Sequence, residues 1–92
     1  MIDKLINSKI AVHCKTEIEA KILMEIFNSH GITWHGGMPM VRHNVWNRHK
    51  EKTCYEITGG HASYTNLGYF TRNGWKIIKF KDLVKEDYNE SN

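Results

Sequence analysis

A helix with clear start and stop signals, lying between two short apolar segments, constrains the fold of this chain more than any other feature. Thr16 and Glu19 form a capping box, in which each side chain satisfies a backbone N–H group that the first helical turn leaves unpaired. Gly31 ends the helix because glycine readily adopts the left-handed conformation that follows a last helical turn. Alternating apolar residues at 9–14 predict a strand before the helix, and residues 31–34 open a second strand after it. The pattern therefore predicts a β-α-β unit.

Five apolar residues of this helix recur at helical spacing and predict the face that packs on the sheet. Ile18, Ile22 and Ile26 form a stripe, which Leu23 and Phe27 reinforce. The charged residues between them face away from the stripe. We therefore expect the stripe to be buried, so that replacing Ile22 by alanine would leave a cavity in the core.

Two consecutive glycines at 59–60 predict a β-hairpin. A two-residue glycine loop suits the turns in which both central residues have positive φ, so 53–58 should pair with 61–65. This register would place Tyr55 opposite Tyr64 on the two strands.

The end of the chain adds a short helix and a last strand. Thr65 or Asn66 provides the N-cap of the helix, Gly74 ends it, and residues 75–80 supply the strand. The predicted order is β-α-β-β-β-α-β. We expect an α+β domain with a single mixed sheet of about five strands and two helices on one side, a variant of the ferredoxin-like scheme.

Length and composition indicate one folded domain over residues 1–92. The chain is 40% hydrophobic and 25% charged, close to the globular average. We expect an ordered body at about 5–84 and a frayed polar tail at 85–92. The N-terminal residues lack the apolar core of a signal peptide and no segment is long enough to span a membrane, so a cytoplasmic location is expected.

Residues 35–52 form one long connection, and such connections in compact domains are usually functional or disordered. Aromatic rings and guanidinium groups in and around it suit a nucleotide or a single-stranded nucleic acid, because bases stack on flat rings and phosphates pair with arginine. The alternative is that Trp34 and Tyr64 belong to the core and the cations form a solvated rim. The candidate ligand-binding residues are Trp34, His35, Arg42, His43, Trp46, Arg48, His49, Tyr64 and Arg72.

A metal site is a less favoured interpretation of the same segment. His35, His43, His49 and Cys54 carry zinc-binding atoms, but they lack the short ligand pairs that are typical of zinc motifs. We therefore expect solvent-facing histidines, a buried Cys54 thiol and no cofactor.

Catalysis is disfavoured as well. Cys14 precedes a helix N-terminus, which could lower the pKa of its thiol, but His13 points to the opposite face of the strand. The chain has no nucleophile elbow, paired-carboxylate site or GxGxxG loop. The formal net charge of +3 permits an anionic partner without requiring one. These features favour a binding protein over an enzyme.

Three segments resemble small proteins encoded by phages and prophages of low-GC Gram-positive bacteria. They are IAVHC (10–14), TCYEI (53–57) and NGWKIIKF (73–80), and the likeness of pattern spans most of residues 9–80. Proteins of this size and origin often resemble counter-defence factors, either anti-CRISPR proteins or proteins of the Thoeris and CBASS anti-defence type that sequester nucleotide signals. The resemblance implies an accessory binding protein. It does not identify the ligand, because the histidine-rich part of the long connection departs from the pattern.

Two classes of function follow from these patterns. A protein that sequesters a nucleotide should contain a partly buried pocket with converging arginines, repeated across the interface of a homo-oligomer. An inhibitor of a host defence protein should instead present a broad exposed surface with unpaired charges and aromatic residues, and no pocket. We expect the first class, with an anionic nucleotide-like ligand and no membrane partner. The inhibitor and a single-stranded nucleic-acid-binding module remain the alternatives.

Overall fold

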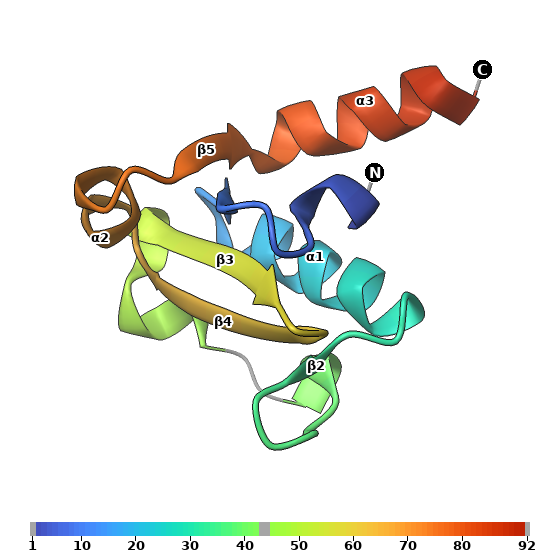
Figure 1. Cartoon of the computed structure of the whole chain (residues 1–92), viewed down its shortest axis with the longest axis horizontal. Coiled ribbons are helices and arrows are strands. Elements are labelled where there is room, and N and C mark those ends of the chain that lie inside the picture. The colour runs from blue at the N-terminus through green and yellow to red at the C-terminus, as the bar shows by residue number, and fades with distance from the viewer. Residues whose placement is uncertain (1, 43–44, 92) are drawn as a thin grey trace.

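The computed structural model of the chain describes residues 2–42 and 45–91, and the surroundings of the side chains up to residue 85. The predicted α+β class and the strand and helix order are confirmed, and one further helix follows the last strand (Figure 1). In chain order the elements are η1 (Ile2–Leu5), β1 (Ile10–His13), α1 (Glu17–Ser29), β2 (Thr33–Trp34), η2 (Met40–Arg42), η3 (Trp46–Arg48), η4 (Lys50–Lys52), β3 (Thr53–Thr58), β4 (His61–Asn66), α2 (Leu67–Arg72), β5 (Lys76–Lys79) and α3 (Phe80–Ser91).

The five strands form one mixed sheet in the order β2-β4-β3-β1-β5. Strand β3 pairs antiparallel with both β1 and β4, whereas β1 and β5 are parallel, as are β2 and β4. The two strands that α1 connects are therefore not neighbours, because the β3–β4 hairpin lies between them. Strands β1 and β3 occupy the interior of the sheet.

The predicted hairpin and helix caps are present. Gly59 and Gly60 have φ angles of 64° and 81°, and Tyr55 lies opposite Tyr64 in the register. The N–H of Glu19 donates to the Thr16 hydroxyl oxygen at 3.2 Å. The second helix begins in the same way, because the N–H of its third residue donates to the side-chain oxygen of the N-cap, Asn66, over 2.8 Å. Local backbone chemistry thus determines where these elements begin.

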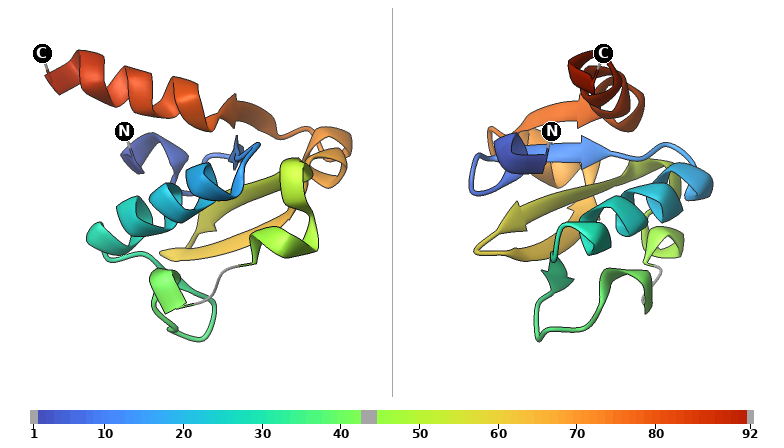
Figure 2. Two further views of the ribbon diagram at one scale, coloured as in Figure 1. Left: turned by 180° about the vertical axis from the view of Figure 1, so that it is seen from behind. Right: turned by 90° about the vertical axis from the view of Figure 1, so that its right-hand side faces the viewer.

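The prediction that both helices lie on one side of the sheet is wrong. Helix α1 crosses one face (Figure 2), where it joins η1 and α3 in the main core. Helix α2 packs on the other face, where Phe70 contacts a smaller cluster that includes Ala11 and Cys54. Successive strand residues point to opposite faces, so Ala11 and Val12 belong to different layers. Both faces of the central strands are therefore covered.

The predicted buried stripe of α1 is wrong in part: Leu23 and Phe27 lie in the main core and Ile26 packs against it, but the other two residues do not. Ile18 is 72% exposed and Ile22 is 41% exposed, so Ile22→Ala is not expected to open a cavity in the core. The helix is rotated about its axis relative to the prediction, because a second stripe with the same spacing includes Leu23 and Phe27 as well. The residues that α1 buries are Ala20, Leu23, Met24 and Phe27.

Both ends of the chain are more structured than predicted. The segment expected to be frayed, 85–92, continues α3 as far as Ser91, and residue 92 lies outside the described part of the chain. Leu83 attaches this helix to the main core. At the other end, Ile2 and Leu5 are buried in the same core.

Candidate binding surfaces

Aromatic and imidazole side chains gather where β2 ends beside β4. The ring centroids of Trp34 and Tyr64 are 5.8 Å apart in an edge-to-face arrangement, and that of His49 lies 6.0 Å from Tyr64. Two further rings form a second pair, because the ring centroids of His35 and His61 are 5.3 Å apart in a tilted arrangement. The structure therefore brings together four of the predicted site residues and adds His61.

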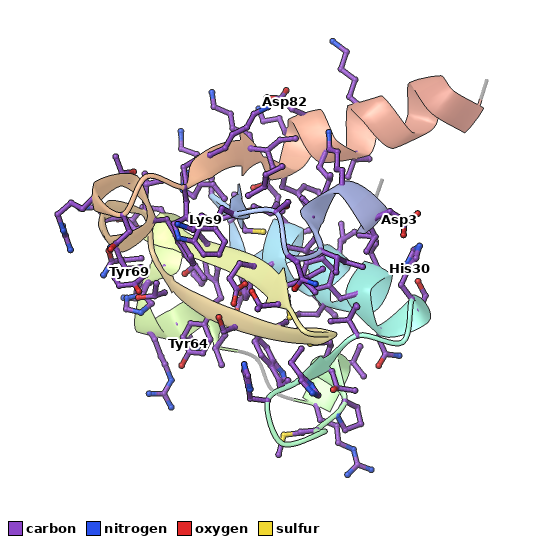
Figure 3. All side chains as sticks on the ribbon, viewed as in Figure 1. Asp3, Lys9, His30, Tyr64, Tyr69 and Asp82 are labelled. Atoms are coloured by element: carbon purple, nitrogen blue, oxygen red, sulfur yellow. The ribbon has the colours of Figure 1, made fainter. Side chains whose placement is uncertain are left out.

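A hollow of about 250 Å³ opens beside this aromatic group. Strand β2 covers β4 only at His61 and Ala62, so the rest of β4 has no strand neighbour on that side within the described chain. The hollow occupies this edge, and Tyr64 of β4, which is labelled in Figure 3, is one of its lining residues. It is lined by Trp34, His35, Val45, Ala62, Ser63 and Tyr64.

The indole N–H of Trp34 has no hydrogen-bond partner, although the side chain is only 7% exposed. A buried donor without an acceptor is unfavourable by about 1–3 kcal/mol. His61 is held differently, because its Nδ1 and the Thr33 hydroxyl are hydrogen-bonded at 3.1 Å. The hollow is thus lined by the Trp34 ring, whose unused N–H donor is buried, and by one imidazole ring, that of His35.

The predicted arginines do not converge on this hollow. Arg42 and Arg48 are exposed on η2 and η3, and Arg72 is exposed on α2, which packs on the opposite face of the sheet. None of the three lines the hollow. Another predicted residue of the long connection, His43, lies outside the described residues.

Trp46 packs against the main core instead of standing in solvent. Its indole N–H donates to the Cys14 carbonyl oxygen at 3.3 Å, and its own carbonyl oxygen accepts the Thr53 hydroxyl at 3.3 Å. These contacts fold the long connection back onto the body of the domain. Trp46 therefore has a structural role whether or not it also contacts a ligand.

The two thiols are buried, and neither is placed as an activated nucleophile. Burial, with contributions from Glu19 and Cys54, raises the pKa of Cys14 well above its usual value of 9.0. Burial also raises the pKa of Cys54 to about 12. Both groups are thus neutral thiols near pH 7. Over residues 2–42 and 45–91, no three His, Cys, Asp or Glu side chains are grouped so that they could hold a metal ion.

A larger hollow lies elsewhere, between α1 and η2, and has a volume of about 520 Å³. Its walls carry the two most exposed large apolar side chains, Ile18 at 72% and Val41 at 54%. Val41 belongs to the long connection, so the predicted segment does contribute to this groove. We call it the α1–η2 groove; it is lined by Glu17, Ile18, Lys21, Met24, Glu25, Met40 and Val41.

The sequence patterns did not indicate this groove, because they assigned Ile18 to the core. The useful signal was the redundancy of α1, which has more apolar residues than one buried face can use. The structure resolves that redundancy by leaving Ile18 and Ile22 outside.

Comparisons with known proteins add nothing to the geometry of these surfaces. No protein-family model matches the chain, and neither a curated protein nor a solved structure matches it. In the part of the chain that the structure describes, no helix is both long enough and apolar enough to cross a membrane.

Proposed function

We propose that this chain is a non-catalytic binding protein that holds an amphipathic helix of a partner protein in the α1–η2 groove. The observation that carries the proposal is the exposure of Ile18, at 72%, on the wall of the α1–η2 groove. Large exposed apolar side chains around a groove are typical of protein interaction sites. Neither class of function is matched in full, because no arginine lines the groove, as expected for a nucleotide pocket, and the surface is hollowed, unlike the one expected of an inhibitor. The exposed apolar walls of the groove support the protein-binding alternative.

The charges on the groove favour a basic partner helix. Glu17 and Glu25 both line it, with Lys21 between them, so the α1 wall carries one more negative charge than positive. The two carboxylates are eight residues apart, or about 12 Å along the helix. A partner helix with an apolar stripe and flanking Lys or Arg residues at similar separation would match this wall. An acidic helix would meet repulsion.

A role in countering host defence forms part of this proposal and is supported by the resemblance to phage and prophage proteins. The partner would then be a host defence protein in the cytoplasm, inhibited through occupation of one of its helices. Inhibition of this kind requires a stable surface complex and no chemical step.

A pair of model peptides tests the groove directly. One labelled peptide carries a Leu stripe at helical spacing with Lys on its flanks, and the other has Glu in place of Lys. Fluorescence anisotropy should detect binding of the Lys peptide to the native chain and much weaker binding of the Glu peptide. Ile18→Asn and Val41→Asn should each weaken binding of the Lys peptide by about tenfold or more, the equivalent of ~1.5–3 kcal/mol for one apolar side chain.

The matched control is Val84→Asn, which changes an exposed apolar residue of α3 outside the groove. It should leave the affinity unchanged. Equal binding by Ile18→Asn and the native chain would contradict the proposal. Dimerisation that Ile18→Asn abolishes, without any peptide binding, would assign the groove to a second copy of the chain.

A second candidate function is supported by the unpaired Trp34 N–H. In this alternative the hollow of about 250 Å³ beside β2 and β4 binds an anionic, nucleotide-like ligand, with Trp34, His35 and Tyr64 as its contacts. The arginines of the long connection are nearby in sequence. Adenosine monophosphate is a suitable probe. Trp34→Phe keeps the ring and removes the donor, so it should weaken binding by about tenfold. Unchanged binding would exclude Trp34 as the donor.

A further inference from the structure

Glu56 is the one charged side chain that is buried in the described part of the chain. It lies on β3 and is 7% exposed, on the face of the sheet that α2 covers. Burial of a carboxylate is costly unless a positive charge or several donors compensate for the lost water. The groups around Glu56 therefore show whether its buried charge is compensated.

Two hydroxyl groups donate to this carboxylate. The Ser63 hydroxyl donates to Oε1, and the Thr58 hydroxyl donates to Oε2 over 2.5 Å. Both donors are neutral. No lysine, arginine or histidine forms an ion pair with Glu56 among residues 2–42 and 45–85, so its negative charge is hydrogen-bonded but not balanced.

A hollow of about 290 Å³ lies against Glu56, and aromatic residues form much of its wall. Tyr69 and Phe70 come from α2, where Figure 3 labels Tyr69, and Trp75 follows that helix. The Phe70 ring lies 5.5 Å from the ring of Tyr69 and 5.0 Å from that of Trp75, both edge-to-face. The complete lining is Glu56, Ser63, Tyr64, Thr65, Tyr69, Phe70 and Trp75.

An unbalanced carboxylate beside aromatic rings suits one class of ligand. Aromatic faces attract cations through their quadrupole, and the attraction is largest for weakly hydrated alkylammonium groups in a desolvated site. A carboxylate adds full charge complementarity at short range. Anions would be repelled, and a neutral apolar group would leave the carboxylate unpaired. The volume is close to the lower limit for small-molecule pockets, about 300 Å³.

From these contacts we infer that the Glu56 hollow binds an alkylammonium group. Glu56 supplies the counter-charge, Ser63 and Thr58 hold the carboxylate in place, and Tyr69, Phe70 and Trp75 form the aromatic wall. The group could belong to a free quaternary amine or to a methylated lysine side chain. This site is separate from the α1–η2 groove and does not depend on it.

Choline and its neutral isostere 3,3-dimethylbutan-1-ol provide a matched pair of probes. Titrations of the ¹⁵N-labelled chain, followed by NMR, should show choline shifting the Trp75 indole N–H and the Ser63 amide, with sodium chloride as the ionic-strength control. The isostere should produce no comparable shifts, because it has the same shape without the charge. A peptide with trimethyllysine, compared with choline, distinguishes the two sources of the group.

Glu56→Gln should weaken choline binding by about tenfold or more, since it removes the counter-charge while keeping the shape. The matched control is Glu51→Gln, which removes the same charge from an exposed position. If Glu56→Gln does not fold, Trp75→Leu decides the question by the same measure, because it removes part of the aromatic wall and leaves the carboxylate. Equal shifts from both probes, or full affinity in the variant that folds, would overturn the proposal.

Discussion

Cys14 and Cys54 are both fully buried, but they belong to different layers of the molecule. Cys14 lies in the main core and Cys54 in the smaller cluster under α2, and both are free thiols. Because water and reagents do not reach them in the folded state, their chemistry should report on unfolding and not on function.

Neither thiol should react with Ellman's reagent in the native protein near pH 8, and both should react once the chain is unfolded in guanidinium chloride. The absorbance of the released thiolate measures this directly. Fast reaction of one thiol without denaturant would show that its layer opens locally.

The raised pKa of Cys54, about 12 in the folded state against 9.0 normally, also predicts a pH dependence of stability. Below pH 9.0 both states keep the proton, so the thiol does not affect the free energy of unfolding. Above it only the unfolded chain releases the proton, so stability should fall as the pH rises toward about 12. Denaturant titrations between about pH 8 and pH 10 should show a steeper fall than in Cys54→Ala. Equal slopes would contradict this assignment.

At the scale of single elements, α1 shows how two apolar stripes compete for one buried face. Leu23 is fully buried whereas its neighbour Ile22 is 41% exposed, although the two residues have nearly the same size and hydrophobicity. This pair provides a test of the helix rotation. Leu23→Ala should lower the free energy of unfolding by about 2–5 kcal/mol, and Ile22→Ala should lower it by less than about 1 kcal/mol. Thermal and denaturant unfolding of the two variants would measure both values, and equal costs would contradict the orientation of α1.

The start and end signals of the elements could be predicted because they depend on neighbouring residues. Thr16, Asn66 and the glycines at 59–60 each determine a cap or turn through their own backbone and side chain. The rotation of α1 and the face that α2 covers depend on residues far away in the sequence, so no local pattern determines them. The helix in the polar tail could not be predicted for the same reason, because α3 is attached through Leu83 to a core whose residues are distant in the sequence.

The candidate sites also differ in whether the sequence could predict them. The contact between Trp34 and Tyr64 was within reach of the sequence, because both belong to predicted strands and are aromatic. The groove beside Ile18 and the hollow beside Glu56 were not, since each is defined by which side chains the fold leaves exposed or buries without a partner.

At the scale of the whole molecule, the sheet has a protected centre and a short, lightly paired edge. Strands β1 and β3 have neighbouring strands on both sides, whereas β2 is two residues long and has one neighbouring strand, β4, with a single isolated bridge from Thr33 to Pro39 on its other side. Amide hydrogen exchange should therefore be slowest for Val12 and Tyr55 and faster for Thr33 by at least about tenfold, because edge strands open without global unfolding. NMR exchange rates would measure the difference. Equal protection would mean that the sheet opens as one unit.

The parallel pairing of β1 with β5 has a mechanical consequence. These strands are the first and last of the chain, and their register runs from Ile10 beside Lys76 to His13 beside Lys79. A force that pulls the two chain ends apart would load their hydrogen bonds side by side in shear, whereas an antiparallel terminal pair would peel open one bond at a time. The domain should therefore resist stretching well for its size. Single-molecule force spectroscopy would detect one abrupt rupture at the β1–β5 pair, preceded by the release of η1 and α3.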